Sequence, residues 1–204
     1  MRVSVKCYRR VTAAALLSVA GLMLVGCAGT VDRGAVRSDG SNAPEAHASV
    51  STSPPQDVTV PELPAAALVH SEAAVEATVE FWWEALHYLR STGDPEPLFR
   101  LYDADCELCL QQALAWSDLY EDGGWAAVSP PELSIDSTIY DQGRATAGVD
   151  IGVSESPIQI FDAEGQPIPA LAVEGSHEEP WMVSLIFDDE ASLWRVEEMR
   201  IAEG

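Results

Sequence analysis

The spacing of apolar positions along the chain changes near residue 124. Between residues 71 and 121, apolar side chains recur every three or four positions, which is the period of an amphipathic helix. From residue 133 onward they alternate with polar residues, which is the period of a half-exposed strand. We therefore predict helices first and antiparallel strands afterwards, in one α+β domain.

The longest predicted helix covers residues 72–92. Ser71 is suited to cap it, because a serine hydroxyl accepts a free backbone N–H of the first turn. Gly93 is placed to end it, since glycine adopts the left-handed conformation common after a helix.

Two shorter helices are predicted to follow. One opens at Asp94-Pro95, because proline fits the first helical position. The other runs from Cys106 to about Glu121, with Asp105 as its cap. Its predicted buried stripe comprises Cys109, Leu110, Ala113, Trp116 and Tyr120.

About six strands are expected in the second half of the chain. Runs rich in aspartate and glycine mark turns at residues 141–143 and 162–165, and an acidic run marks one at 188–191. The expected strands are 133–140, 144–153, 158–160, 168–173, 179–187 and 193–201.

The N-terminus has the features of an export signal. Residues 1–10 are basic, and residues 11–25 form a stretch without charge. This stretch is shorter than the roughly 20 residues that span a bilayer and fits the apolar part of a signal peptide. We predict residues 1–26 to be a signal peptide, using general secretion, since the surroundings of Arg9-Arg10 match a twin-arginine motif poorly.

The signal ends in Leu24-Val25-Gly26-Cys27, which resembles the bacterial lipobox. The resemblance implies cleavage before Cys27 and a diacylglycerol on its thiol. The protein would then be held at the extracytoplasmic face of the cell membrane by its lipid, because two or three acyl chains anchor stably. An ordinary secretory signal with a chance cysteine is the alternative.

Residues 27–64 are predicted to be the lipidated cysteine and a disordered tether. After Cys27 the segment has no aromatic residue, no isoleucine and a single leucine, so it cannot bury enough apolar surface to fold. Its root-mean-square span is about 35 Å. Fourteen of the 15 aromatic residues lie between Phe81 and Trp194, which places the globular domain at residues 65–204.

Charge narrows the choice of partners. The whole chain has 33 acidic and 11 basic residues, a net charge of −22, and four of the basic residues fall in the signal. So acidic a protein is repelled by nucleic acids and by anionic lipid headgroups. The chain is nevertheless 47% hydrophobic, which is enough for a core.

The order of helices and strands resembles the nuclear-transport-factor-2-like superfamily, also called the polyketide-cyclase-like cone fold. The final hairpin, residues 180–201, looks like the closing pair of that fold. The resemblance implies three N-terminal helices packed on a curved, cone-like antiparallel sheet of about six strands.

Six short segments carry a second resemblance, and they are Pro61–Pro64, Phe81–Tyr88, Thr92–Asp94, Pro97-Leu98, Asp105–Cys109 and Tyr120–Gly124. They resemble an uncharacterised lipoprotein domain family of high-GC Gram-positive bacteria. The resemblance covers residues 61–124 well and the strands loosely. That family has no assigned activity, so the resemblance implies a fold and a location only.

Cys106 and Cys109 are the one chemical motif of the mature domain. The two residues are three positions apart at the start of a helix, so their Cα atoms are close enough for a disulfide. An oxidising exported compartment favours such a bond. The alternative is a thiol–disulfide oxidoreductase, since a helix N-terminus lowers the pKa of a thiol. Thioredoxin-type motifs normally follow a strand, whereas a helix precedes this pair. Two thiolates alone make only half a zinc site.

The other candidates are an aromatic pocket and acidic side chains. Four rings that could line a pocket inside the cone are Trp82, Trp116, Trp181 and Tyr140. In that pocket Asp136 or Asp150 could act as an acid or base beside Tyr140. Asp188–Glu190 offer oxygen ligands to calcium, but acids are usual in a hairpin turn. We predict no cofactor, no metal and no catalytic residue.

Two functions remain open. The first is a non-catalytic domain that binds a small ligand or an unidentified envelope protein. The second is an enzyme, working through the cysteine pair or through acid–base catalysis in the cone. The lack of the common nucleophile and phosphate-loop motifs favours the first.

Overall fold

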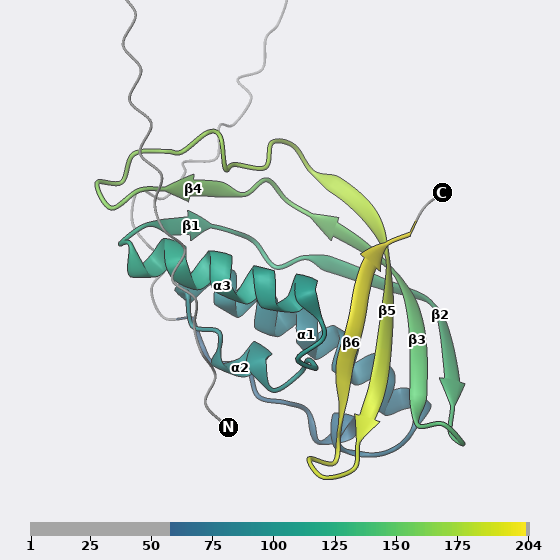
Figure 1. Cartoon of the computed structure of the whole chain (residues 1–204). Coiled ribbons are helices and arrows are strands. Elements are labelled where there is room, and N and C mark those ends of the chain that lie inside the picture. Colours follow the sequence, from purple (N-terminus) through teal and green to yellow (C-terminus); the bar gives the residue numbers. More distant parts are fainter. Residues whose placement is uncertain (1–57, 203–204) are drawn as a thin grey trace, which may run out of the picture. The chain divides into compact units, whose positions relative to one another are not determined.

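The computed structural model of the chain describes residues 58–202. The predicted signal peptide, Cys27 and most of the predicted tether lie outside the described residues. Helices come first and antiparallel strands afterwards (Figure 1), so the predicted α+β class is confirmed.

The domain has four helical segments and six strands in residues 58–202. The helical segments are the 3-10 helix η1 (Ala65–Leu68), α1 (Glu72–Thr92), α2 (Glu96–Phe99) and α3 (Glu107–Glu121). The strands are β1 (Trp125–Ala127), β2 (Glu132–Asp141), β3 (Thr146–Glu155), β4 (Gln159–Phe161), β5 (His177–Asp188) and β6 (Leu193–Ile201).

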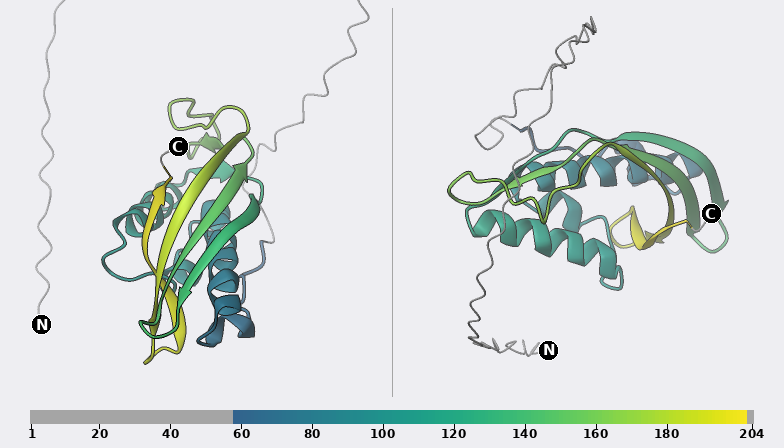
Figure 2. Two further views of the ribbon diagram at one scale, coloured as in Figure 1. Left: turned by 90° about the vertical axis from the view of Figure 1, so that its right-hand side faces the viewer. Right: turned by 90° about the horizontal axis from the view of Figure 1, so that it is seen from above.

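The six strands divide between two antiparallel sheets. The larger has the order β2-β3-β5-β6, and the smaller consists of β1 and β4. The larger sheet is strongly curved (Figure 2), as expected for a cone-like fold. Helix α1 contacts β2, β3 and β6, and α3 packs beside α1 against β6.

The main core lies between α1 and the larger sheet. On β3 every second residue from Ala147 to Val153 is buried, which is the predicted period of two. These side chains meet the buried face of α1, which includes Trp82, Trp83 and Leu86. Trp194 on β6 is fully buried in the same core.

Helix α1 begins and ends as predicted. The Ser71 hydroxyl accepts the N–H of Ala74 at 3.2 Å, which caps the first turn. Gly93 follows the last turn with φ +78°, and its N–H donates to the Leu89 carbonyl.

Helix α3 differs from the prediction at two positions. Its cap is Cys106 and not Asp105, because the Cys106 Sγ accepts the N–H of Cys109 at 3.3 Å. Leu110, predicted to be buried, is 42% exposed. Only Cys109 and Ala113 are fully buried along α3, so this helix covers the core with a narrower face than its sequence suggests.

Two strand predictions are corrected. Residues 168–173 do not form a strand, because Pro167 and Pro169 lack the N–H that a ladder needs and the chain turns at residues 169–171. Strand β1 was not predicted, since three residues are too few to show an alternating pattern.

The segment before η1 is partly attached to the domain. Leu63, within the predicted tether, is half-buried and packs against the main core. No helix within residues 58–202 has the length and apolar character needed to span a membrane.

Candidate functional site

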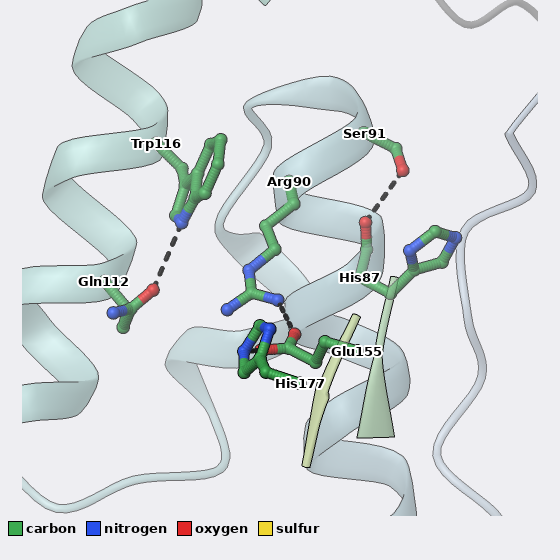
Figure 3. A network of polar contacts seen from close by, with 7 residues as sticks. All are labelled: His87, Arg90, Ser91, Gln112, Trp116, Glu155 and His177. Carbon is green, nitrogen blue, oxygen red and sulfur yellow. Dashed lines mark hydrogen bonds and ion pairs between the residues drawn. The ribbon is translucent and has the colours of Figure 1, made fainter. Parts of the chain in front are cut away.

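Three charged side chains meet where α1, β3 and β5 come together. Arg90 lies in the last turn of α1, and Glu155 and His177 are paired across β3 and β5. The Arg90 Nη1 donates to Oε1 of Glu155, and the His177 Nε2 lies 3.4 Å from the other carboxylate oxygen. Figure 3 shows the three side chains converging. We call this set the Arg90 cluster.

Helix α3 closes the other side of the Arg90 cluster. The Arg90 guanidinium carbon lies 5.7 Å from the centre of the Trp116 ring, within cation–π range. The Trp116 indole N–H donates to the Gln112 Oε1 at 3.1 Å (Figure 3). The Tyr120 hydroxyl donates to the Arg90 carbonyl at 2.9 Å, and burial raises the pKa of Tyr120. The cluster therefore joins α1, α3 and the larger sheet.

The Arg90 cluster is suited to holding these elements together. The side chains of Arg90 and Glu155 are only 13% and 14% exposed, and each offsets the charge of the other. His87, one turn before Arg90, points its imidazole away from Glu155 (Figure 3). Burial, and then the positive charge of Arg90, lowers the pKa of His87. Of the two histidines, His177 contacts Glu155 and His87 does not, so the carboxylate does not connect them.

Cys106 and Cys109 are joined by a disulfide, with Cα atoms 5.3 Å apart. The two residues are 2% and 0% exposed. Thiol–disulfide exchange requires a thiolate to reach one of the sulfurs, so burial of both opposes a redox function. The Cys106 sulfur also caps α3, which gives the bond a structural role.

A groove of about 670 Å³ lies between the start of α3 and the end of β6. Cys106 forms part of its wall, beside Leu108 and Met199. Two of its acids, Asp105 and Glu107, lie at the N-terminal end of α3, where negative charge stabilises a helix. Four carboxylates line it in all: Asp105, Glu107, Glu197 and Glu198.

We expect the disulfide to resist glutathione in the folded protein and to react rapidly in urea, because unfolding exposes both sulfurs. Replacing both cysteines by serine should cost about 1–2 kcal/mol, since the closed loop is very short. The measurements are thiol alkylation followed by mass spectrometry, and urea unfolding. Rapid exchange in the native state would contradict a structural role and favour the oxidoreductase alternative.

The four predicted pocket rings all belong to the main core or pack against it. Trp82 is buried, and Trp181 lies edge-on to Trp83 with ring centres 5.8 Å apart. Trp116 contacts the Arg90 cluster and Tyr140 lies beside His70. None of the four lines the groove beside α3. The four rings therefore serve as packing at different places in the domain: Trp82 is buried in the core, and the other three are partly buried against it.

The predicted acids do not share a pocket with Tyr140. Asp150 alternates with the buried Val149 and Ile151, so it lies on the outer face of the sheet. There it accepts the Ser137 hydroxyl at 2.8 Å. Asp136 is exposed at an irregularity of β2, and the Tyr140 hydroxyl donates to the His70 carbonyl at 3.1 Å.

The acidic hairpin between β5 and β6 is engaged within the chain. Asp188 accepts the N–H groups of Glu190 and Ala191 and pairs with Arg195 at 2.9 Å. The N–H of Ala191 is the main cause that lowers the pKa of Asp188. In the part of the chain that the structure describes, no three His, Cys, Asp or Glu side chains gather in a metal-binding arrangement.

The sequence profile described as "Family of unknown function (DUF6318)" matches residues 47–200. The match therefore covers nearly all of the folded part, stopping one residue before the end of β6, and extends into the predicted tether. No curated protein is significantly similar to this chain in sequence.

Several solved structures are similar in fold. The intermembrane space region of the chloroplast protein ARC6 superposes with a TM-score of 0.51 and 15% identity, over 66% of this chain and 98% of that chain. A protein of unknown function with a cystatin-like fold from Methylobium petroleophilum PM1 gives 0.35 at 13% identity, over 66% and 79%. The association domain of C. elegans CaMKII gives 0.32 at 14% identity, over 65% and 98%. At these identities the similarity concerns the fold alone.

Proposed function

The chain belongs to the DUF6318 family, whose function is unknown, and we propose that it is a lipid-anchored protein whose α+β domain binds a partner without catalysis. The anchor is a lipid on Cys27. The domain lies on the extracytoplasmic face of the cell membrane, and its partner is a small ligand or an envelope protein.

The sequence of the N-terminus supports the anchor. A basic start, a short uncharged stretch and a cysteine directly after Leu24-Val25-Gly26 occur in the order that export and lipid attachment require. The disulfide at Cys106 and Cys109 also fits an oxidising compartment outside the cytoplasm. The resemblance to lipoproteins of high-GC Gram-positive bacteria agrees with this location.

The closed interior of the cone is the observation that carries the non-catalytic interpretation. Trp82, Trp83 and Trp194 fill it and are at most 2% exposed. A substrate would have to displace these rings, each of which contributes several kcal/mol to the core. Binding at the surface needs no such rearrangement.

The position of the acidic groups points in the same direction. Asp136 is exposed at an irregularity of β2 and Asp150 lies on the outer face of β3, so neither carboxylate faces the apolar interior of the domain. Their surroundings therefore resemble an ordinary polar sheet surface.

Replacing Cys27 by serine should release the protein from the membrane into the soluble exported fraction, because the thiol that accepts the lipid is lost. The matched control is Cys7→Ser, which alters the predicted signal peptide and should leave the membrane fraction unchanged. Membrane and soluble fractions are compared by immunoblotting. Retention of Cys27→Ser in the membrane would contradict the lipid anchor.

The full chain carrying Cys27→Ser is the appropriate bait for finding a partner, because it is free of its own lipid. Envelope extract is passed over the immobilised protein, and bound proteins and small molecules are identified separately. Turnover of any captured molecule, as opposed to its recovery unchanged, would contradict the non-catalytic function.

A further inference from the structure

A second groove, which we call the β4 groove, lies between residues 157–161 and 167–175. Its volume is about 480 Å³, within the roughly 300–1,000 Å³ typical of small-molecule sites. Nine of its twelve lining residues are apolar, including Phe161, Ile168 and Val173. Its floor is a small second core around Ile158 and Ile160. The groove is therefore a preformed apolar surface.

Both edges of β4, which runs along the β4 groove, are already hydrogen-bonded to the rest of the domain. Strand β4 pairs with β1 on one edge. On the other edge Ile158 and Val173 exchange both of their N–H···O bonds, and the Ile168 N–H donates to the Ile160 carbonyl at 2.7 Å. An added peptide strand needs free N–H and C=O groups, so this arrangement disfavours a peptide and leaves apolar contact as the means of binding.

Charge sets the β4 groove apart from the rest of the domain. Residues 65–204 hold 28 acidic side chains against five arginines, yet a single charged residue, Glu174, lines this groove. An apolar chain can lie in the groove without burying a carboxylate. Glu174, with the net negative field of the domain, disfavours a ligand whose polar end is an anion.

We propose that the β4 groove binds a neutral single-chain lipid, its alkyl chain on Ile160 and Val173 and its uncharged polar end near Glu174. At about 30 Å³ for each water-sized group, the groove holds roughly sixteen such groups, enough for one chain of about twelve carbons and too few for two chains of that length. The inference rests on the proposed function, since a domain tethered to a membrane is supplied with such molecules.

The test uses the full chain carrying Cys27→Ser and two probes with the same alkyl chain, 1-monolauroylglycerol and laurate. Both are titrated calorimetrically below their critical micelle concentrations. We expect saturable binding of one monolauroylglycerol per chain, with laurate about tenfold weaker or more. Failure of monolauroylglycerol to bind would overturn the inference.

Two exposed positions give a matched pair of variants. Val173 lines the groove and is 38% exposed, whereas Leu171 lies outside the lining and is 55% exposed. Val173→Glu should weaken binding of monolauroylglycerol about tenfold or more, because it places a charge against the alkyl chain. Leu171→Glu should change it less than about twofold. Equal losses in the two variants would overturn the assignment to this groove.

A third variant, Glu174→Gln, tests whether the polar end of the bound lipid lies near Glu174. Removing the carboxylate should bring laurate to within about threefold of monolauroylglycerol while leaving the neutral probe almost unchanged. An unaltered preference would contradict the position given to the polar end.

The same titration on the lipid-bearing wild-type chain distinguishes a separate lipid from the chain's own. If the wild-type chain binds the probe as well as Cys27→Ser does, the ligand is a separate lipid. If the wild-type chain does not bind it, the chain's own acyl group fills the groove, and the proposal is overturned.

The proposed function is tested separately. Retention of Cys27→Ser in the membrane contradicts the lipid anchor whatever the probes do, and absence of probe binding does not bear on the anchor.

Discussion

Gly93→Ala should destabilise the domain by about 2–5 kcal/mol, well beyond the usual effect of a single methyl group. Gly93 has φ +78°, a conformation that costs an L-residue roughly 1–2 kcal/mol. In addition, a Cβ there would lie 2.4 Å from the Cβ and 2.5 Å from the Cγ of Tyr120. These atoms are the base of a side chain and cannot swing aside.

Tyr120 is held at both of its ends, which is why we expect the cost to be large. Its hydroxyl donates to the Arg90 carbonyl and accepts the N–H of Ala126 at 3.3 Å. One turn earlier, the Ser117 hydroxyl donates to the Gly93 carbonyl at 3.0 Å. Relief of the clash therefore requires α1 and α3 to move apart, with loss of these bonds.

Gly165→Ala is the matched control for Gly93→Ala. Gly165 has nearly the same conformation, φ +75°, but no heavy atom lies within 4 Å of the position that its Cβ would take. Only the backbone penalty applies, so we expect a loss of about 1–2 kcal/mol. Urea unfolding of the two variants measures the difference. Equal losses would contradict the close approach of α3 to Gly93.

The contrast between these glycines shows what the sequence could predict. Thr92-Gly93 indicates a helix end from local chemistry alone, and the end lies there. The approach of Tyr120, 27 residues later, depends on how two helices pack, and no local pattern reports it. The same holds for α3, where the period predicted burial of Leu110 but the packing angle leaves it exposed.

Strand predictions succeeded where one face is buried and failed at β1 and at residues 168–173. Along β3 the alternation of Val149, Asp150 and Ile151 reflects a core on one side and solvent on the other. The segment around Pro167 and Pro169 has apolar residues as well, yet its prolines reduce pairing with residues 158–161 to isolated bridges. Apolar content alone therefore did not distinguish a strand from the wall of a groove.

The chemical motif of the sequence and the most connected polar cluster of the structure are different sites. The spacing of Cys106 and Cys109 is local, so a disulfide could be predicted. Arg90 and Glu155 are 65 residues apart, and His177 is 22 residues further on. Nothing in the sequence pairs them until β3 and β5 are in register. A basic residue in the last turn of α1 was the single local signal.

Arg90→Ala should cost about 3 kcal/mol of unfolding free energy, the second large effect that we expect. The substitution leaves the Glu155 carboxylate 86% buried and without its guanidinium partner. It also removes the cation–π contact with Trp116. The matched control is Arg100→Ala. That arginine pairs with Glu96 at 2.8 Å, but the two side chains are 53% and 63% exposed, so the loss should stay below about 1 kcal/mol.

A double variant separates lost charge pairing from lost packing at Arg90. If the cost of Arg90→Ala comes from the unpaired carboxylate, adding Glu155→Gln should recover roughly half of it, because a neutral amide is cheaper to bury than a charge. If the cost comes from the contacts of the arginine stem with Trp116, the second substitution should recover nothing. Urea unfolding of the four proteins in this cycle gives the coupling directly. A loss for Arg90→Ala no larger than that for Arg100→Ala would mean that the Arg90 cluster does not hold α1 to the sheet.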